Sequence, residues 1–378
     1  MKLKWNDKNI TDFVESVTWG GSAYQASRTL EFSLLYSPLD DNLKDINIKL
    51  GDRVKLYDDS NRLLINAMVY TRERASSNGT ITYSCMDDMN RLIRSNGTYN
   101  FKNSTPERIT KKVCNDIGVK VGNVATTNVT IKTLLIDAGS FYDIILKAYT
   151  KAHKANSKKY LPIMVNQSLN VIEKGEIVAN FTLSDKVNIT SSSYSETLDN
   201  MINKVKIYDE SGKQIGEVVN KSNIDKYGIF QEAYAKEDGV NATTASKSML
   251  NGIDKTASVE ALGNVECIAG YGVKIKDSIT KLTGVFWIDS DSHTWKNGTH
   301  TMSLDLMFKN IMELSEDETS KSSSKGSSGT DWDGVTVYLG TNSTKYHKKK
   351  TCSNIKGIKT LTKDEAEKQG YFHCKKCF

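Results

Sequence analysis

The chain has 378 residues, of which 38% are hydrophobic and 25% are charged, and these proportions exclude a disordered chain or a fibre. The 51 lysine and arginine residues exceed the 45 aspartate and glutamate residues by 6, an excess too small to indicate a class of partner. No run of about 20 apolar residues is present, which argues against a membrane-spanning helix. The polar N-terminus predicts no signal peptide, so we expect the chain to be made and first folded in a cytosol.

The N-terminal quarter is predicted to form antiparallel β-structure. Residues 28–36 read RTLEFSLLY, a run rich in strand-forming side chains, and similar runs cover 53–57, 63–72 and 79–85. The last two runs are separated by a turn that contains Asn-Gly, a pair that favours a hairpin. Short strands joined by polar turns are typical of a barrel or a sandwich, so residues 1–95 are predicted to form one β domain.

Two helices are predicted next. Thr105 is followed by proline and glutamate, which provide a capping hydroxyl, a residue suited to the first turn and an acid at the positive helix end. Ser140 begins a capping-box pattern and is followed by an apolar helical face. Residues 161–165 and 169–173 are predicted to pair as a hairpin. Residues 96–180 are therefore predicted to form an α+β insertion domain.

Strands return after about residue 181. A hairpin is predicted around residues 209–212, and the helical spacing of Ala245, Met249 and Ile253 predicts a helix over residues 241–255. Further strands are predicted at 257–269, 272–275, 284–290 and 301–308. Residues 181–314 are therefore predicted to form a second β domain.

A small module is predicted at the C-terminus. Residues 315–330 read SEDETSKSSSKGSSGT, which lacks the apolar side chains that a core requires, so this stretch is predicted to be a flexible linker. Residues 331–378 contain ten lysines against five carboxylates, together with three of the 6 cysteines. The whole chain has too few cysteines for a disulfide scaffold.

The cysteines of this module have the spacing of a metal site. His347 and Cys352 form one close pair, and Cys374 and Cys377 form a C-x2-C pair further on, which together predict a tetrahedral site. His373 is an alternative to His347, but neighbouring residues such as His373 and Cys374 rarely point at the same ion, so we favour His347. Four protein ligands leave no open position, which predicts a structural metal. The competing interpretation is a disulfide with two free thiols.

The main body resembles the hub proteins of contractile phage tails, the late control protein and XkdQ-like families. Residues 283–308, TGVFWIDSDSHTWKNGTHTMSLDLMF, match the end of that family, in which a strand ends in a Ser-x-His-x loop and a glycine turn leads into a final strand. Here residues 291–294 are the expected loop and Asn297-Gly298 the expected turn. The run 226–231 and the Trp5-Asn6 opening also match. The resemblance covers roughly residues 1–314.

This resemblance implies a fold and a structural role. It implies an α+β fold that is mostly β, with two β-barrel domains similar to a tail-tube subunit and an α+β insertion between them. It further implies a homotrimer that joins a six-fold tail tube to a three-fold spike, with baseplate wedge proteins as further partners and no catalysis. We expect assembly in a bacterial cytoplasm, location in the baseplate of a phage or a phage-tail-like bacteriocin, and envelope contact at the tip.

The C-terminal module resembles small metal-binding modules of the Ada type. The matching features are Tyr346-His347, Cys352, a helix around residues 362–369, and Gly370-Tyr371 before the C-x2-C pair. The family usually has proline before that pair, where this chain has His373. The resemblance implies zinc, or alternatively iron, in a structural role. The lysines of the module are compatible with a solvated face and, alternatively, with contact to nucleic acid or anionic wall polymers, and no nucleic acid is expected as a specific ligand.

Other polar residues have simpler interpretations. His293 and His300 lie near two aspartates, which is compatible with metal or acid–base chemistry, but we favour a loop whose polar groups bind turn backbone. Cys85, Cys114 and Cys267 lie in strand or helix patterns and are predicted to be buried thiols. The alternatives to a structural hub are a tail-associated peptidoglycan hydrolase and a nucleic-acid-binding protein that uses the basic module.

Overall fold

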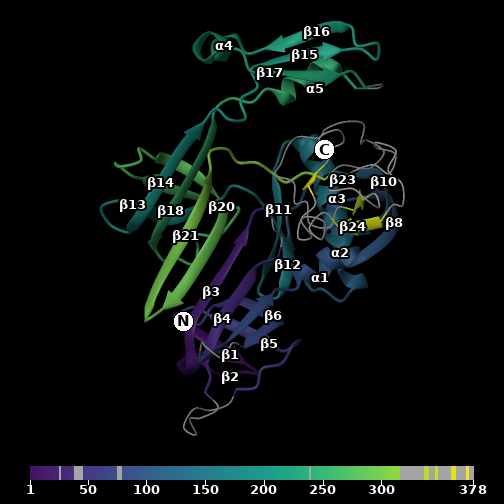
Figure 1. Cartoon of the computed structure of the whole chain (residues 1–378). Helices are drawn as coiled ribbons and strands as arrows, with labels where there is room; N and C mark the ends of the chain where they lie inside the picture. The colour runs from purple at the N-terminus through teal and green to yellow at the C-terminus, as the bar shows by residue number, and fades with distance from the viewer. Residues whose placement is uncertain are drawn as a thin grey trace. The chain divides into compact units, whose positions relative to one another are not determined.

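The computed structural model describes residues 1–24, 27–37, 46–74, 79–237 and 240–315, together with the backbone of four short strands beyond residue 335 (Figure 1). The chain divides into two compact units, Met1–Ser322 and Ser323–Phe378. The fold is mostly β, as the sequence predicts. No helix in the described part is long and apolar enough to cross a membrane.

The strands of the N-terminal β-rich part pair antiparallel with one another. Its strands are β1 (Lys2–Trp5), β2 (Lys8–Asn9), β3 (Val14–Ser22), β4 (Thr29–Leu35), β5 (Arg53–Tyr57), β6 (Leu63–Arg74) and β7 (Thr80–Met86). Apolar residues alternate along β4 and β7, so one face of each strand is buried. Phe32 of β4 stacks on its cross-strand partner Tyr83 of β7, with ring centroids 4.9 Å apart. These rings lie in a core made mostly of side chains from this part, to which Trp295 from later in the chain also belongs.

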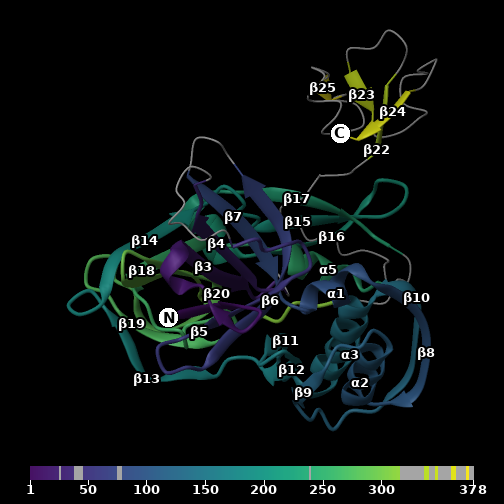
Figure 2. The same ribbon diagram turned by 90° about the horizontal axis from the view of Figure 1, so that it is seen from below.

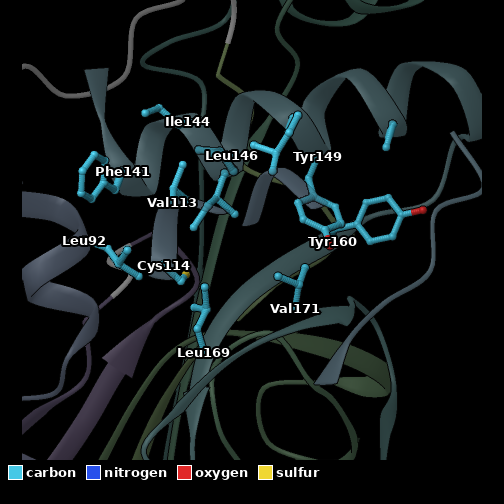
Figure 3. Packing of buried hydrophobic residues seen from close by; sticks show 14 of the residues in the cluster. Leu92, Val113, Cys114, Phe141, Ile144, Leu146, Tyr149, Tyr160, Leu169 and Val171 are labelled. Carbon is cyan, nitrogen blue, oxygen red and sulfur yellow. The ribbon is translucent and has the colours of Figure 1, made fainter. Parts of the chain in front are cut away.

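The α+β part follows and has its own core. Its elements are α1 (Met89–Arg94), β8 (Asn96–Ser104), α2 (Pro106–Asp116), β9 (Val121–Val124), β10 (Ile131–Ser140), α3 (Phe141–Asn156), β11 (Tyr160–Val165) and β12 (Ser168–Glu173). Figure 3 shows Tyr149 of α3 beside Tyr160 of β11, with Val113 and Cys114 of α2 on the same buried side. Both predicted caps are confirmed, because the side chains of Thr105 and Ser140 accept hydrogen bonds from helix backbone. The paired strands β8 and β10 were not predicted.

The C-terminal β-rich part surrounds a third core. Its strands are β13 (Ile177–Ser184), β14 (Ile189–Thr197), β18 (Asp254–Leu262), β19 (Gly272–Lys276), β20 (Thr283–Lys296) and β21 (Thr299–Met307). The turn between β20 and β21 is at Asn297-Gly298, as predicted, and both residues have positive φ. The strand predicted over 257–269 is wrong at both ends, because β18 begins at Asp254 and ends at Leu262.

A small α/β subdomain is inserted between β14 and β18. It contains β15 (Lys204–Tyr208), β16 (Gln214–Val219), α4 (Lys221–Tyr227), β17 (Gln231–Ala235) and α5 (Ala242–Met249). The hairpin of β15 and β16 is confirmed. The helix predicted over 241–255 is too long. It ends at Met249 because Asn251 bridges to Ile202 and residues from Asp254 onward pair with β14.

One continuous sheet joins the two β-rich parts. Its strand order is β14-β18-β21-β20-β3-β4-β7-β6-β5-β1-β2, with β13 and β19 branching from β20. The connection is the antiparallel pair of β20 and β3, which runs from Ser290↔Ser22 to Lys296↔Ser16. Figures 1 and 2 show the purple β3 beside the green β20 in both views. The loop predicted at 291–294 is therefore wrong, because these residues lie in the second half of β20.

Residues 310–315, which follow β21, connect the C-terminal β-rich part to the α+β part through hydrogen bonds. The Asn310 side chain donates to the carbonyl oxygen of Lys174 (3.0 Å), and the Tyr142 hydroxyl donates to Glu313 (2.7 Å). Met312 between them is buried in the core of the α+β part. Ser315 N–H then donates to the Thr150 hydroxyl (3.0 Å). The position of this segment is thus determined by hydrogen bonds to groups that lie 136, 171 and 165 residues earlier in the chain.

The second unit contains a four-stranded sheet. Its strands are β22 (Thr336–Leu339), β23 (Lys345–His347), β24 (Lys359–Thr362) and β25 (Phe372–His373), in the order β24-β22-β23-β25. Parallel pairing places Tyr346 of β23 opposite His373 of β25. Residues 363–369, where a helix is predicted, lie outside the described residues.

Candidate functional site

The junction between β3 and β20 contains a buried polar cluster. A β-bulge between Ile288 and Ser290 changes which residues of β20 face the interior, because one extra residue reverses the alternation. After the bulge Asp291, His293 and Trp295 are buried. Two residues of the predicted loop are therefore interior residues of a strand.

The centre of this cluster, which we call the junction cluster, is an ion pair between Arg28 and Asp291. Arg28 Nη1 donates to Asp291 Oδ1 (2.9 Å) and Nη2 donates to Oδ2 (2.5 Å), so the contact is bidentate. The two residues are only 5% and 4% exposed. Asp291 Oδ1 also accepts a hydrogen bond from the backbone N–H of Ala269 (2.7 Å). The Arg28 Cζ atom lies 4.2 Å from the centroid of the Trp19 ring. The pair crosses from the beginning of β4 to β20 and so connects the two β-rich parts.

Two glycines of β3 make room for this contact. A Cβ atom on Gly20 would lie 2.5 Å from the Asp291 carbonyl oxygen, and one on Gly21 would lie 2.8 Å from Arg28 Nη1. The first of these neighbours is backbone, which cannot move aside without disturbing the strand pair. The sequence Trp19-Gly20-Gly21 thus provides an aromatic face for the guanidinium and space for β20.

The histidines of the junction cluster are neutral. His293 Nε2 lies 3.1 Å from the Cys267 carbonyl oxygen, so it must donate, and its Nδ1 then accepts from His300 Nε2 at 3.2 Å. Burial lowers the pKa of both His293 and His300 to about 4, since a charged ring would lose its hydration. The His300 ring also stacks on Trp295, with centroids 4.1 Å apart.

A second buried carboxylate lies beside the junction cluster. Asp87 accepts hydrogen bonds from the Ser27 hydroxyl (2.9 Å), the Arg28 backbone N–H (3.2 Å) and the Met89 backbone N–H (3.1 Å). Burial raises the pKa of Asp87 to about 6, against the lowering effect of these donors. The backbone of Arg28 is therefore fixed on one carboxylate while its side chain binds another.

This geometry fits a structural joint better than a reaction centre. The charges of Arg28 and Asp291 neutralise each other, and the histidine protons are used in hydrogen bonds within the cluster. Among the described residues, no group of three or more histidine, cysteine, aspartate or glutamate side chains is arranged to bind a metal. The favoured interpretation of His293 as a turn residue is wrong, because it lies in the core of a strand pair.

The predicted metal ligands lie outside the region where side chains are described. Cys352, Cys374 and Cys377 are outside the described residues, and for His347 only the backbone is described, as the last residue of β23. The metal site therefore stays a prediction. The other three cysteines, Cys85, Cys114 and Cys267, are confirmed as buried free thiols, and burial raises the pKa of each to about 12.

A family model described as YqbQ-like matches residues 17–307, which is more than three quarters of the chain. The chain belongs to the YqbQ-like family. The uncharacterized protein YqbQ of Bacillus subtilis (strain 168) is 26% identical over 306 residues, which cover 78% of this chain and 92% of that protein. The phage-like element PBSX protein XkdQ of the same strain is 26% identical over 314 residues, 79% of this chain and 93% of XkdQ. The predicted resemblance to XkdQ-like proteins is thereby confirmed.

The YqbQ-like fold is shared with phage tail proteins of known structure. The prophage MuSo2 43 kDa tail protein of Shewanella oneidensis has a TM-score of 0.62 at 15% identity, covering 81% of this chain and 97% of that one. A tail protein of Neisseria meningitidis MC58 has a TM-score of 0.56 at 14% identity, covering 81% of this chain and 95% of that one. At such identities the likeness concerns the fold alone.

Sequence reasoning missed Arg28, Trp19 and the two glycines in this YqbQ-like chain. The only local signal is a tryptophan followed by two glycines within a strand-like run, and an arginine just before another. Asp291, the partner of Arg28, is 263 residues away from it, so no local pattern relates them.

Gly20→Ala is expected to lower the free energy of unfolding by about 1–3 kcal/mol, because the added methyl group forces β20 away from β3. Urea unfolding followed by tryptophan fluorescence measures this change. Gly216→Ala is the matched control, since the nearest atom to its added Cβ would be 3.6 Å away, and it should change stability by less than about 1 kcal/mol. Equal effects of the two substitutions would contradict the close approach at the junction.

The histidines predict a loss of stability in mild acid. The folded-state pKa of His293, about 4, lies below its ordinary value of 6.5, so between these values the unfolded chain binds a proton that the folded chain does not. Stability therefore decreases as the pH falls from 6.5 to 4. At about 1.4 kcal/mol per pKa unit, His293 alone accounts for roughly 3 kcal/mol of this loss.

Urea unfolding of the wild type and of His293→Gln at several pH values tests this expectation. The free energy of unfolding of the variant should decrease less steeply than that of the wild type as the pH falls from 6.5 to 4. Asp87 changes the stability in the opposite direction. Its raised pKa means that the folded chain keeps a proton that the unfolded chain releases. Asp87 is present in both proteins, so its effect cancels when the two curves are compared. His153→Gln, which replaces a histidine in the last turn of α3 outside the junction cluster, is the control variant. Parallel curves for wild type and His293→Gln would show that His293 titrates normally.

Proposed function

We propose that this chain is a structural hub subunit in the baseplate of a contractile phage tail or a phage-tail-like particle. Membership of the YqbQ-like family, the relationship to XkdQ of the PBSX element and the fold shared with phage tail proteins support a tail role. The observation that carries the hub role is the continuous sheet through β3 and β20. It makes one stiff body from two β-rich parts.

The proposed mechanism is a match of symmetries. If each β-rich part corresponds to one tail-tube subunit, three chains present six units in a ring. Such a trimer meets a six-fold tube on one side and a three-fold spike on the other, with wedge proteins around it. A joint inside each chain must then resist deformation. The buried bidentate ion pair between Arg28, which immediately precedes β4, and Asp291 of β20 meets that requirement, because β4 and β20 lie on either side of β3. In this proposal the chain catalyses no reaction.

The C-terminal unit is proposed to be a metal-stabilised module of the assembled particle. His347, Cys352, Cys374 and Cys377 would bind zinc, or alternatively iron, and the metal would stabilise a unit whose own core is small. The module would take part in forming the tip of the particle where it meets the cell envelope.

Light scattering coupled to size-exclusion chromatography, followed by electron microscopy of the chain mixed with its cognate tube protein, tests the hub role. A trimer that caps the end of tube rings is expected. A chain that stays monomeric in the presence of tube and spike proteins would overturn the proposal, as would β-rich parts that contact the tube in two unrelated ways.

A further inference from the structure

A polar pocket of about 510 Å³ lies where the N-terminal β-rich part meets the α+β part. β1 contributes Lys4, β5 contributes Arg53 and Lys55, and α1 contributes Arg91. The loop between α2 and β9 contributes Lys120. The size lies within the range of about 300–1,000 Å³ that is usual for ligand pockets. The wall of this pocket, which we call the basic pocket, comes from two parts that have separate cores.

The basic pocket has a surplus of positive charge. Against the five cations stand the carboxylates of Asp7 and Asp88. Lys55 Nζ binds Asp7 at 2.8 Å and Arg53 Nη2 binds Asp88 at 2.5 Å, so each carboxylate is already paired. Three cations are left without a counter-charge in the pocket.

The three remaining cations, Lys4, Arg91 and Lys120, differ in how freely their side chains can bind a ligand. The Arg91 guanidinium donates to the Ile117 carbonyl oxygen, which fixes its orientation. Lys4 Nζ lies 5.1 Å from the Tyr57 ring centroid. Lys120 is exposed and its ammonium group has no hydrogen-bond or ion-pair partner among the described residues. Together they form an unneutralised positive field within a concave wall, which favours an anion.

The rest of the lining decides what kind of anion fits. Asn6, Asn66 and Gln167 contribute side-chain amides, and the Asn66 Oδ1 atom is buried without a hydrogen-bond partner. Amides donate and accept, as a peptide backbone does. The paired carboxylates of Asp7 and Asp88 oppose a ligand that is charged at every unit, such as a polyphosphate. We propose that the basic pocket binds an acidic peptide segment of another protein, with carboxylates on the free cations and backbone on the amides.

Fluorescence anisotropy of a labelled peptide of alternating glutamate and serine, titrated with the full-length chain, tests this proposal. We expect saturable binding that weakens with added salt and that is lost when glutamine replaces glutamate in the peptide. Lys4→Glu and Lys120→Glu should each weaken binding about tenfold, which corresponds to about 1.4 kcal/mol.

The matched control is Lys111→Glu, which makes the same charge change at an exposed position of α2 outside the pocket. It should change the affinity for the peptide by less than about twofold. A larger change would mean that long-range charge, and not the pocket, explains the weaker binding of the pocket variants. Absence of binding, equal weakening by all three variants, or tighter binding of tripolyphosphate than of the acidic peptide would each overturn the proposal. The test uses the isolated chain, so its outcome does not depend on the hub role.

Discussion

Asp291→Ala is expected to lower the free energy of unfolding by about 3–5 kcal/mol, because it leaves the Arg28 guanidinium buried without a counter-charge. The same change leaves the Ala269 backbone N–H without its acceptor. Urea unfolding measures the loss, and the fluorescence of Trp19 and Trp295 reports on the junction itself. An effect of this size would remove much of the stability of an ordinary domain.

Two further variants distinguish the buried ion pair of Arg28 and Asp291 from an ordinary surface ion pair. Glu173→Ala breaks the pair of Lys158 and Glu173, whose side chains are 50% and 53% exposed, and should cost far less stability than Asp291→Ala, because solvent screens exposed charges. Combined replacement of Arg28 by methionine and Asp291 by leucine should restore most of the stability, since no unpaired charge remains. If Asp291→Ala costs no more than Glu173→Ala, the ion pair does not stabilise the junction.

Metal removal is expected to unfold the C-terminal unit and leave Met1–Ser322 folded. The proposed site would contain one metal ion per chain, and a unit of this size depends on such an ion for folding. Elemental analysis of the purified chain before and after a strong chelator, combined with limited proteolysis, measures both consequences. The expected proteolysis product after chelation is a fragment that ends near the serine-rich stretch.

Single substitutions test the predicted ligand set. Cys374→Ser and His347→Gln should each abolish stoichiometric metal binding, whereas His373→Gln should retain it and serves as the control. Loss of metal in His373→Gln with retention in His347→Gln would reverse the assignment of the histidine ligand. A metal-free chain with a disulfide in this unit would refute the site as a whole.

Much of the secondary structure could be predicted from local sequence. The Thr105 and Ser140 caps and the alternating strands such as Thr29–Leu35 depend on neighbours within a few residues, so their patterns are visible in the chain itself. The closing segment at 283–308 also indicated the family. The strand β10 escaped prediction because its pairing with β8 depends on partners that precede it by 27 residues at Ile131↔Ser104 and by 44 residues at Ser140↔Asn96.

The sequence by itself determined the class of fold, the two helix starts and the relationship to XkdQ-like proteins. It also determined the hairpin turns between β15 and β16 and between β20 and β21, because all of these follow from short-range patterns. Only the tertiary structure decided the role of Asp291 and His293. The family resemblance implies a loop at 291–294, yet here a β-bulge turns Asp291 and His293 inward, and Arg28, 263 residues away, neutralises the carboxylate. A buried charge is stable only beside its partner, and that pairing arises from the strand order, which no local pattern specifies.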